Sequence, residues 1–436
     1  MKGAKYSGVA KLTLIITAIL VAGPMFAQAP DFSQANGDYY RVHYQGPESR
    51  SQDLARQLDA CAELFEEYLH FERSGLKVKL RVRIFPTQEN YKKYLKDIIG
   101  EPKDSFVYLQ YSDPAMNELV GYETGAGFEN SLVHHAFIQY LKSFITHPPL
   151  WLQKGMAIYL ENSRYNPERG RAEYHENLAW LKSLKTYIAL DTEVIPVSIL
   201  LTMDVAAANR RIESFYAQSW GLVHFLLNSE NKDYNRILWD TLSFLKSDAS
   251  RQENETLVLD KGFGWVNKDL FLSDFEEYIN TVKTFPDLVQ EGIIAYNRGD
   301  FDAAEELFNR SLELKKDHYI PYYYLGLIQY ARQDYTVSDN YYQRALERGG
   351  SRGLIYYARG ITAYSARNDE EAKDFLSSAV EADPEGYGVK ARELLSRLET
   401  EEPETAAPEE DAADQDPAES EDPSEEISEP APDAGA

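Results

Sequence analysis

Apolar side chains recur every three or four positions along residues 131–144. The recurring positions are Val133, Phe137, Tyr140, Leu141 and Phe144. This spacing puts them on one stripe of a helix and predicts that the stripe is buried. The intervening positions fall on another face of the same helix, which we expect to be a polar surface. They are Ser131, His135, Gln139 and Lys142.

A second helical pattern runs through residues 54–65 and contains the only cysteine of the chain, Cys61. Its neighbours on the predicted apolar stripe are Leu54, Leu58, Leu64 and Phe65. We expect Cys61 to be a small buried residue, and a single cysteine forms no intramolecular disulfide. Stability must therefore come from hydrophobic cores. The 436 residues are 43% hydrophobic and 13% aromatic, which is enough for two folded domains.

Toward the C-terminus the sequence repeats itself with a fixed period. Gly292, Gly326 and Gly360 are 34 residues apart, and other positions keep the same spacing. These are Phe301, Tyr335 and Asp369, then Ala304, Ser338 and Ala372, and then Phe308, Tyr342 and Leu376. The pattern resembles tetratricopeptide repeats, whose helix pairs approach closely at small residues. We expect three such repeats and a capping helix over residues 285–399.

The resemblance also implies which side chains line the concave groove of the repeats. Five tyrosines fall on groove positions: Tyr296, Tyr330 and Tyr364 at position 12 of the first helix, with Tyr323 and Tyr357 at position 5. Such a surface suits an extended or helical peptide of a partner protein. The alternative is that the capping helix or the neighbouring domain fills the groove. Residues that would clamp a C-terminal carboxylate are not evident there.

Residues 132–157 have the frame of a zinc-peptidase site with most of its working residues replaced. In an H-E-x-x-H helix two histidines bind zinc and the glutamate activates water. Here His134 holds the first histidine position, His135 the glutamate position and Ile138 the second histidine position. A W-L-x-E-G-x-A segment would supply the third ligand, and in Trp151–Ala157 that position is Lys154.

This frame resembles the peptidase MA-like, gluzincin-type metallopeptidase domains, and the likeness extends over residues 30–284. It implies a small N-terminal sheet with an extended segment at 39–44, a strand at 77–85 and a helix opening at Thr87. It also implies a helix around 215–223 and a closing helix around 275–278. Only His134 carries over as a ligand.

The replacements indicate a domain without metal catalysis. Zinc needs three protein ligands, Ile138 has no lone pair, and a cationic Lys154 repels the ion. We therefore expect no catalytic residues, no cofactor and no metal, with His134 as the only candidate ligand. The alternative hypothesis is a zinc metallopeptidase with an unorthodox site around His134 and His135.

Residues 1–29 are laid out as a secretory signal peptide. Lysines precede the apolar run 12–23, and Ala27-Gln28-Ala29 offers a cleavage site. The run is short for a spanning helix. Pro30 would follow the cleavage point and is unfavourable there, so an uncleaved membrane anchor stays open. The protein is expected to be exported, to the periplasm or the medium.

The net charge of −26 is concentrated at the C-terminus. From Glu401 onward there are 15 acidic residues and no basic one. Residues 400–436 cannot bury enough apolar surface to fold and are expected to be a disordered acidic tail. A chain this acidic without a basic stripe disfavours nucleic acid as a partner.

Together these patterns predict an α-rich α+β protein. A degenerate zinc-peptidase-like domain with a small sheet would be followed by an all-α tetratricopeptide solenoid and the acidic tail. Its expected function is non-catalytic, mediating protein–protein interaction or scaffolding in the cell envelope.

Overall fold

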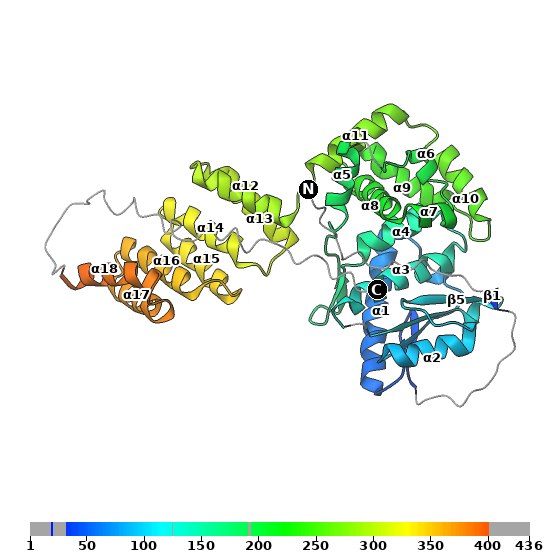
Figure 1. Cartoon of the computed structure of the whole chain (residues 1–436), viewed down its shortest axis with the longest axis horizontal. Coiled ribbons are helices and arrows are strands. Elements are labelled where there is room, and N and C mark those ends of the chain that lie inside the picture. The colour runs from blue at the N-terminus through cyan, green and yellow to red at the C-terminus, as the bar shows by residue number, and fades with distance from the viewer. Residues whose placement is uncertain (1–18, 21–31, 124, 191–192, 401–436) are drawn as a thin grey trace, which may run out of the picture. The chain divides into compact units, whose positions relative to one another are not determined.

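The computed structural model describes residues 19–20, 32–123, 125–190 and 193–400. The chain divides into two compact units, with the boundary between Val282 and Lys283. The first unit combines a mixed sheet with helices, and the second contains helices alone over the part that the structure describes (Figure 1).

Six strands form the sheet of the first unit, in the spatial order β1-β5-β6-β4-β3-β2. They are β1 (Ile19–Leu20), β2 (Ser33–Asn36), β3 (Tyr40–Tyr44), β4 (Leu80–Phe85), β5 (Val107–Tyr111) and β6 (Glu118–Tyr122). Strands β3, β4 and β6 run parallel, whereas β2 and β5 pair antiparallel with β3 and β6. Helix α1 (Glu48–Leu69) makes the crossover that a parallel β3–β4 pair requires. The predicted N-terminal sheet is confirmed.

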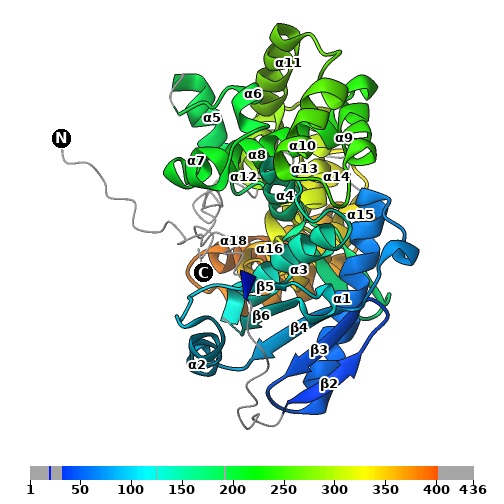
Figure 2. The ribbon, with the colours of Figure 1, turned by 90° about the vertical axis from the view of Figure 1, so that its right-hand side faces the viewer.

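Each face of the sheet is covered by a different set of helices. Val42, Val82 and Leu119 belong to the large core shared with α1 and α3 (Phe128–Phe144). Val107, Leu109 and Val120 pack on the other face against α2 (Gln88–Ile99), and Figure 2 shows α2 on the opposite side from α1 and α3. The Thr87 side chain caps α2 by accepting from the Asn90 amide.

The rest of the first unit is mainly helical. Its elements are α4 (Leu150–Leu160), β7 (Arg164–Asn166), β8 (Arg171–Glu173), α5 (Leu181–Leu190), α6 (Val197–Leu200), α7 (Val205–Arg210), α8 (Ile212–Asn228), α9 (Lys232–Phe244), α10 (Arg251–Leu257) and α11 (Lys268–Thr281). Strands β7 and β8 form a small antiparallel pair. Helix α4 packs closely against α8 because Gly155 has no side chain: a Cβ there would lie 2.3 Å from the Ser219 carbonyl oxygen.

Helix α3 is buried on nearly all sides, contrary to the amphipathic pattern. The apolar stripe is buried over most of its length, but so is much of the face that we expected to be polar surface: Ser131, His135 and Gln139 are 9%, 8% and 0% exposed. The reason is position, since α3 lies in the core with the sheet on one side and α4 beside it. The buried Gln139 side chain donates a hydrogen bond from Nε2 to the Arg81 carbonyl, 2.9 Å away.

Over residues 283–400, which the structure describes, the second unit consists of three helical hairpins and a last helix. The helices are α12 (Phe285–Asn297), α13 (Phe301–Leu314), α14 (Tyr319–Ala331), α15 (Tyr335–Glu347), α16 (Arg352–Ser365), α17 (Asp369–Ala382) and α18 (Tyr387–Thr400). A Cβ on Gly292, Gly326 or Gly360 would lie 2.8, 2.5 or 2.7 Å from Phe308, Tyr342 or Leu376, respectively. The repeating glycine and the repeating bulky residue therefore meet inside each hairpin, as the 34-residue period predicts.

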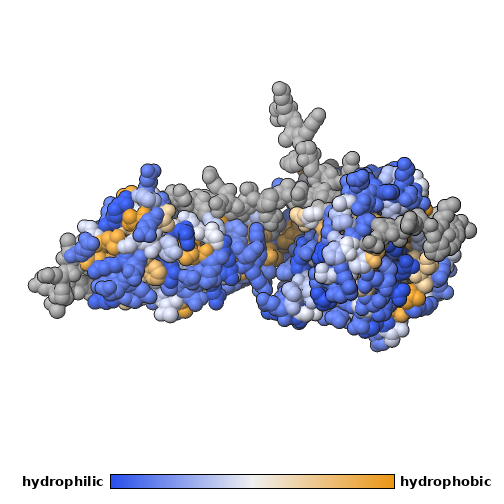
Figure 3. Space-filling view, turned by 90° about the horizontal axis from the view of Figure 1, so that it is seen from below, coloured by the Kyte–Doolittle hydropathy of each residue, from blue (hydrophilic) through white to orange (hydrophobic). Residues whose placement is uncertain are grey.

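Most of the predicted leader and the whole tail from Glu401 lie outside the described residues, apart from Ile19–Leu20 in β1. Within the described ranges, no helix combines the length and the apolar character needed to span a membrane. The face of the molecule in Figure 3 is mostly hydrophilic, and hydrophobic residues form small groups on it.

Candidate functional site

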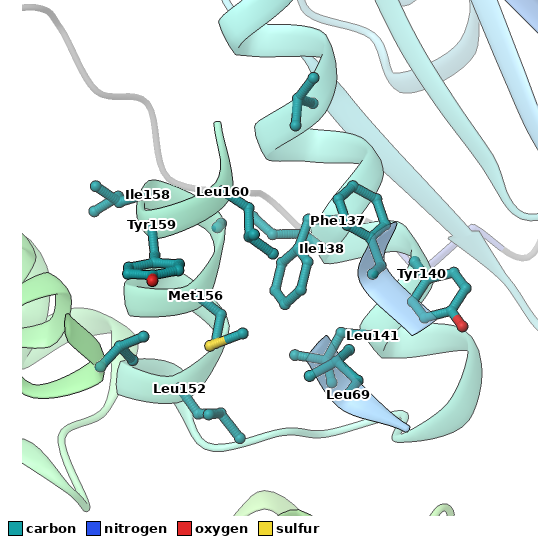
Figure 4. Close-up of a cluster of buried hydrophobic side chains, with 14 of the residues drawn as sticks. Leu69, Phe137, Ile138, Tyr140, Leu141, Leu152, Met156, Ile158, Tyr159 and Leu160 are labelled. Atoms are coloured by element: carbon teal, nitrogen blue, oxygen red, sulfur yellow. The ribbon is translucent and has the colours of Figure 1, made fainter. Parts of the chain in front are cut away.

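The zinc-peptidase frame of the sequence maps onto α3 and α4, which lie side by side in the core. Ile138, at the second histidine position, is fully buried. Figure 4 shows it in an apolar cluster between the two helices, with Met156 and Leu160 on the α4 side. The structure therefore uses this position for packing.

His135, at the glutamate position, is held by local contacts. Its Nδ1 donates to the Ser131 carbonyl over 2.7 Å, and its ring stacks on Phe106 with 5.1 Å between centroids. Burial first, and then the neighbouring His134 and Lys154, hold the pKa of His135 well below its ordinary value. His135 is a neutral, packed side chain and not the surface residue that the helical pattern suggested.

His134 pairs with a carboxylate that the sequence analysis did not identify. Its Nδ1 shares a 2.8 Å hydrogen bond with Oε2 of Glu161, the residue that follows α4. The other oxygen of Glu161 accepts from Asn177 at 2.7 Å, and Asn177 also donates to the Ile158 carbonyl. The available signal was spacing: Glu161 follows Lys154 by seven residues, two helical turns along the same face.

Lys154 lies deep in this region and has little to neutralise it. Its side chain is 2% exposed, and its ammonium stands 5.6 Å from the centroid of the Tyr216 ring on α8. Burial lowers the pKa of Lys154 to about 8, although the attraction of Glu161 opposes the shift. Among the described residues, no carboxylate lies within ion-pair distance of this ammonium.

The pKa of the Glu161 carboxyl group is unusually high, although the charge of Lys154 acts to lower it. Burial raises its pKa to about 8, against the hydrogen bond from Asn177 and the charges of Lys154 and Arg164. Its side chain nevertheless keeps 22% exposure, whereas that of His134 keeps 8%. Glu161 is thus the most exposed of His134, Lys154 and Glu161.

Helix α8 contributes two further buried polar groups, one hydroxyl and one indole nitrogen. The Tyr216 hydroxyl and the Trp220 indole nitrogen find no hydrogen-bond partner among the described residues. Tyr216 also stacks on Trp180 with 5.9 Å between ring centroids. Buried polar atoms without partners are rare, and they recur at ligand sites.

A second polar network surrounds His224 of α8, which the sequence offered no spacing to identify. His224 Nε2 lies 2.7 Å from Glu176, and its Nδ1 lies 2.8 Å from the Tyr278 hydroxyl. Glu176, which contacts His224, is followed in the chain by Asn177, which contacts Glu161. One short segment therefore connects the His224 network with the His134–Glu161 pair. The network ties α8 and the closing helix α11 to that segment.

His134 and Glu161 bring two possible metal ligands together in this region. Over the described part of the chain, no group of three or more histidine, cysteine, aspartate or glutamate side chains is arranged to hold a metal ion. His134 and Glu161 offer two donors, and the remaining positions of the frame are filled by Ile138 and Lys154. A tetrahedral site needs at least one further protein ligand.

The five groove tyrosines of the repeats separate into two groups. Tyr296, Tyr330 and Tyr364 are half-buried and keep part of their surface accessible. Tyr323 and Tyr357 are only 1% exposed, so the structure places them in the core of the repeats rather than on an accessible groove surface. Position 5 lies closer to the neighbouring helices than the repeat pattern suggested: Tyr323 packs on Tyr342 and Tyr357 on Tyr387.

Comparison with known proteins identifies the second unit and leaves the first without a described activity. Residues 289–338 and 330–387 match a tetratricopeptide repeat family, and residues 132–244 match a family described as protein of unknown function (DUF1570). No curated protein matches the chain. A similar solved structure is the first tetratricopeptide domain of Spaghetti (RPAP3) bound to the HSP90 peptide SRMEEVD. It is 16% identical, covers 26% of this chain and 91% of that chain, and has a TM-score of 0.24.

The second unit is therefore built from tetratricopeptide repeats, on the evidence of the family match, the 34-residue period and the glycine contacts inside each hairpin. Repeats of this kind are associated with protein–protein interaction.

Proposed function

We propose that this protein is a non-catalytic binding protein of the cell envelope, in which the repeat groove takes an extended or helical segment of a partner protein. The observation that carries the proposal is the position of Tyr296, Tyr330 and Tyr364. They occupy the same place in three successive repeats and stay partly accessible, while Tyr323 and Tyr357 beside them are buried.

Aromatic side chains at an accessible groove suit peptide recognition because each gives a large apolar contact and a hydroxyl at its rim. Tyr330 has the central position, and its hydroxyl reaches Ser365 of the next repeat at 3.0 Å. That contact holds the ring in place across the repeat junction. A rigid, pre-positioned aromatic side chain loses little conformational entropy when it binds a partner.

The first unit, under this proposal, keeps a peptidase MA-like frame without its chemistry. Catalysis at such a site requires a metal-bound water and a base. Ile138 is committed to the apolar cluster between α3 and α4, and His135 to Ser131 and Phe106. These contacts support the view that the domain binds and does not hydrolyse.

To test the groove, peptides that bind the full chain are selected from a displayed random library. Their binding affinities are then measured by calorimetry. Truncating a central interface tyrosine commonly costs about 2 kcal/mol, so Tyr330→Ala should weaken binding by tenfold or more. Tyr341→Ala removes a half-buried tyrosine from the second helix of the same repeat and should leave affinity within about twofold.

Deletion of residues 401–436 separates the groove from the acidic tail. We expect the deletion to change the salt dependence and the association rate more than the affinity, since exposed charge acts mainly on encounter. If Tyr330→Ala keeps its peptides while the tail deletion loses them, with both proteins folded by circular dichroism, the groove assignment is wrong.

The alternative, a zinc metallopeptidase around His134 and His135, is tested by metal analysis after dialysis. We expect less than stoichiometric zinc and no peptide hydrolysis. One equivalent of retained zinc that is lost together with activity in His134→Ala would replace the binding proposal with the enzyme.

Export is the remaining part of the proposal, and it depends on the layout of residues 1–29. Expression of the full chain with a reporter after residue 60 should place the reporter outside the cytoplasm. Mass measurement of the exported protein would then distinguish cleavage near Ala29 from an uncleaved anchor.

A further inference from the structure

The strongest unexplained feature outside the repeats is the ammonium of Lys154 in the core of the first unit. An unpaired buried charge is costly, and a protein usually pairs it or keeps it neutral. Lys154 is 2% exposed and has the Tyr216 ring as its neighbour at 5.6 Å, but no carboxylate at ion-pair distance within the described chain. Glu161, the nearby acid, is already engaged by His134 and Asn177.

A second, independent observation lies on the same aromatic residue. The Tyr216 side chain is 1% exposed, and its hydroxyl has no hydrogen-bond partner among the described residues. Lys154 and Tyr216 thus present two donors in one buried region: an ammonium without an ion pair and a phenol hydroxyl without a hydrogen-bond partner, both among the described residues. From these groups we infer that Lys154 and Tyr216 form a binding site for a ligand with a single carboxylate group.

The charge of the site selects the class of ligand. A carboxylate would accept hydrogen bonds from the Lys154 ammonium and the Tyr216 hydroxyl, and its charge would neutralise that of Lys154. A dianion such as phosphate would leave a net negative charge buried beside a single ammonium. Glu161, in the same region, keeps 22% of its side chain exposed.

Two sources can supply such a carboxylate: a small free acid or the C-terminus of a peptide. Both share the group that the site recognises, so the first test is for the carboxylate itself. Calorimetry and ligand-observed NMR on the full chain would compare benzoate and hippurate with their neutral amides. Each acid should bind at least tenfold more tightly than its amide. Tighter binding of hippurate indicates a peptide C-terminus, and tighter binding of benzoate indicates a small acid.

Lys154→Met keeps the length of the side chain and removes its charge, so the preference for acid over amide should disappear. Lys182→Met, at an exposed lysine of α5, is the matched control and should retain the preference. Because Lys154→Met removes a buried unpaired charge, its melting temperature should equal or exceed that of the unmodified protein. A loss of binding together with an unchanged or raised melting temperature is not explained by unfolding.

Tyr216→Phe provides a second variant that keeps the ring and removes only the hydroxyl. It should weaken benzoate or hippurate binding by about threefold to tenfold without lowering stability. The inference is overturned if acid and amide bind equally to the unmodified protein. It is equally overturned if Lys154→Met keeps the preference, or if inorganic phosphate binds more tightly than either acid. The result does not depend on the repeat groove, so the two proposals can fail separately.

Discussion

The cores of the two units treat buried polar groups differently. In the repeats, the buried hydroxyls of Ser311, Ser338 and Thr362 each donate to a backbone carbonyl nearby. In the first unit, the Tyr216 hydroxyl is buried without such a partner among the described residues, and the Lys154 ammonium beside its ring makes no ion pair there. One repeat hydroxyl, on Tyr323, also has no partner among the described residues, but the first unit places its unpaired Tyr216 hydroxyl in the same region as a buried ammonium, a combination common at functional sites.

Close helix contacts show the same contrast. Gly155 in the first unit faces the backbone carbonyl of Ser219, while the repeat glycines face the side chains of the second helix. A side chain can turn aside, but the backbone of a buried helix can move only with the helix. The first unit therefore tolerates less change at its central contact.

The largest predicted effect tests this contrast directly. Gly155→Ala should lower the free energy of unfolding by about 3 kcal/mol, because the new Cβ meets a backbone oxygen. Gly360→Ala should change it by no more than about 1 kcal/mol, since Leu376 can adjust and alanine favours the helix. Urea unfolding of both variants measures the difference. Equal losses would show that the α4–α8 contact yields as readily as a repeat hairpin.

A smaller effect should appear as a pH dependence confined to the first unit. The folded-state pKa of Glu161 is about 8, above its ordinary 4.5, so the folded protein holds this proton more tightly. The contribution of Glu161 to stability is therefore fully present below pH 4.5 and is lost as the pH rises toward 8.

Glu161→Gln cannot titrate and should lack this dependence. Relative to that variant, the unmodified protein should lose about 1.4 kcal/mol of stability between pH 6 and pH 7, which lies inside this window. Chemical unfolding at several pH values compares the two proteins, with Glu347→Gln on the exposed surface of α15 as the control. Parallel profiles for Glu161→Gln and the unmodified protein would contradict the raised pKa.

The smallest predicted effect concerns Tyr323 in the repeats. Its hydroxyl is buried and has no hydrogen-bond partner among the described residues. Tyr323→Phe should therefore raise the free energy of unfolding by about 0.5–1 kcal/mol, because an unsatisfied polar atom is removed and the ring stays. Tyr341→Phe, whose side chain is half-buried on α15, should be close to neutral. A clear loss of stability in Tyr323→Phe would show that its hydroxyl is satisfied in solution.

The repeats were the part most fully predicted from sequence, because their contacts are local. The residue that fills the space above Gly326 is Tyr342, only sixteen positions later in the same hairpin. A fixed period repeats the same contact three times, so helix boundaries and packing partners follow from spacing. The exception was position 5, where Tyr323 and Tyr357 became core residues because the next helices cover them.

The first unit was predicted in outline, but its central polar group was not. The small N-terminal sheet and the helices around it were expected from the sequence. The burial of His135 and Gln139 was not expected. An amphipathic pattern indicates one buried face of a helix, whereas α3 is packed against neighbours on several faces. The His224 contacts to Glu176 and Tyr278 also join residues 48 and 54 positions apart, which no local spacing indicates.

The sequence by itself determined the helical repeats and the glycines that let their helices approach. These depend on residue identity and short-range spacing, which a sequence states directly. Only the tertiary structure decided that Glu161 would pair with His134, and that Lys154 and Tyr216 would be buried together, with the Tyr216 hydroxyl lacking a partner among the described residues. The cost or use of a charge depends on its surroundings, and several distant segments supply those surroundings at once.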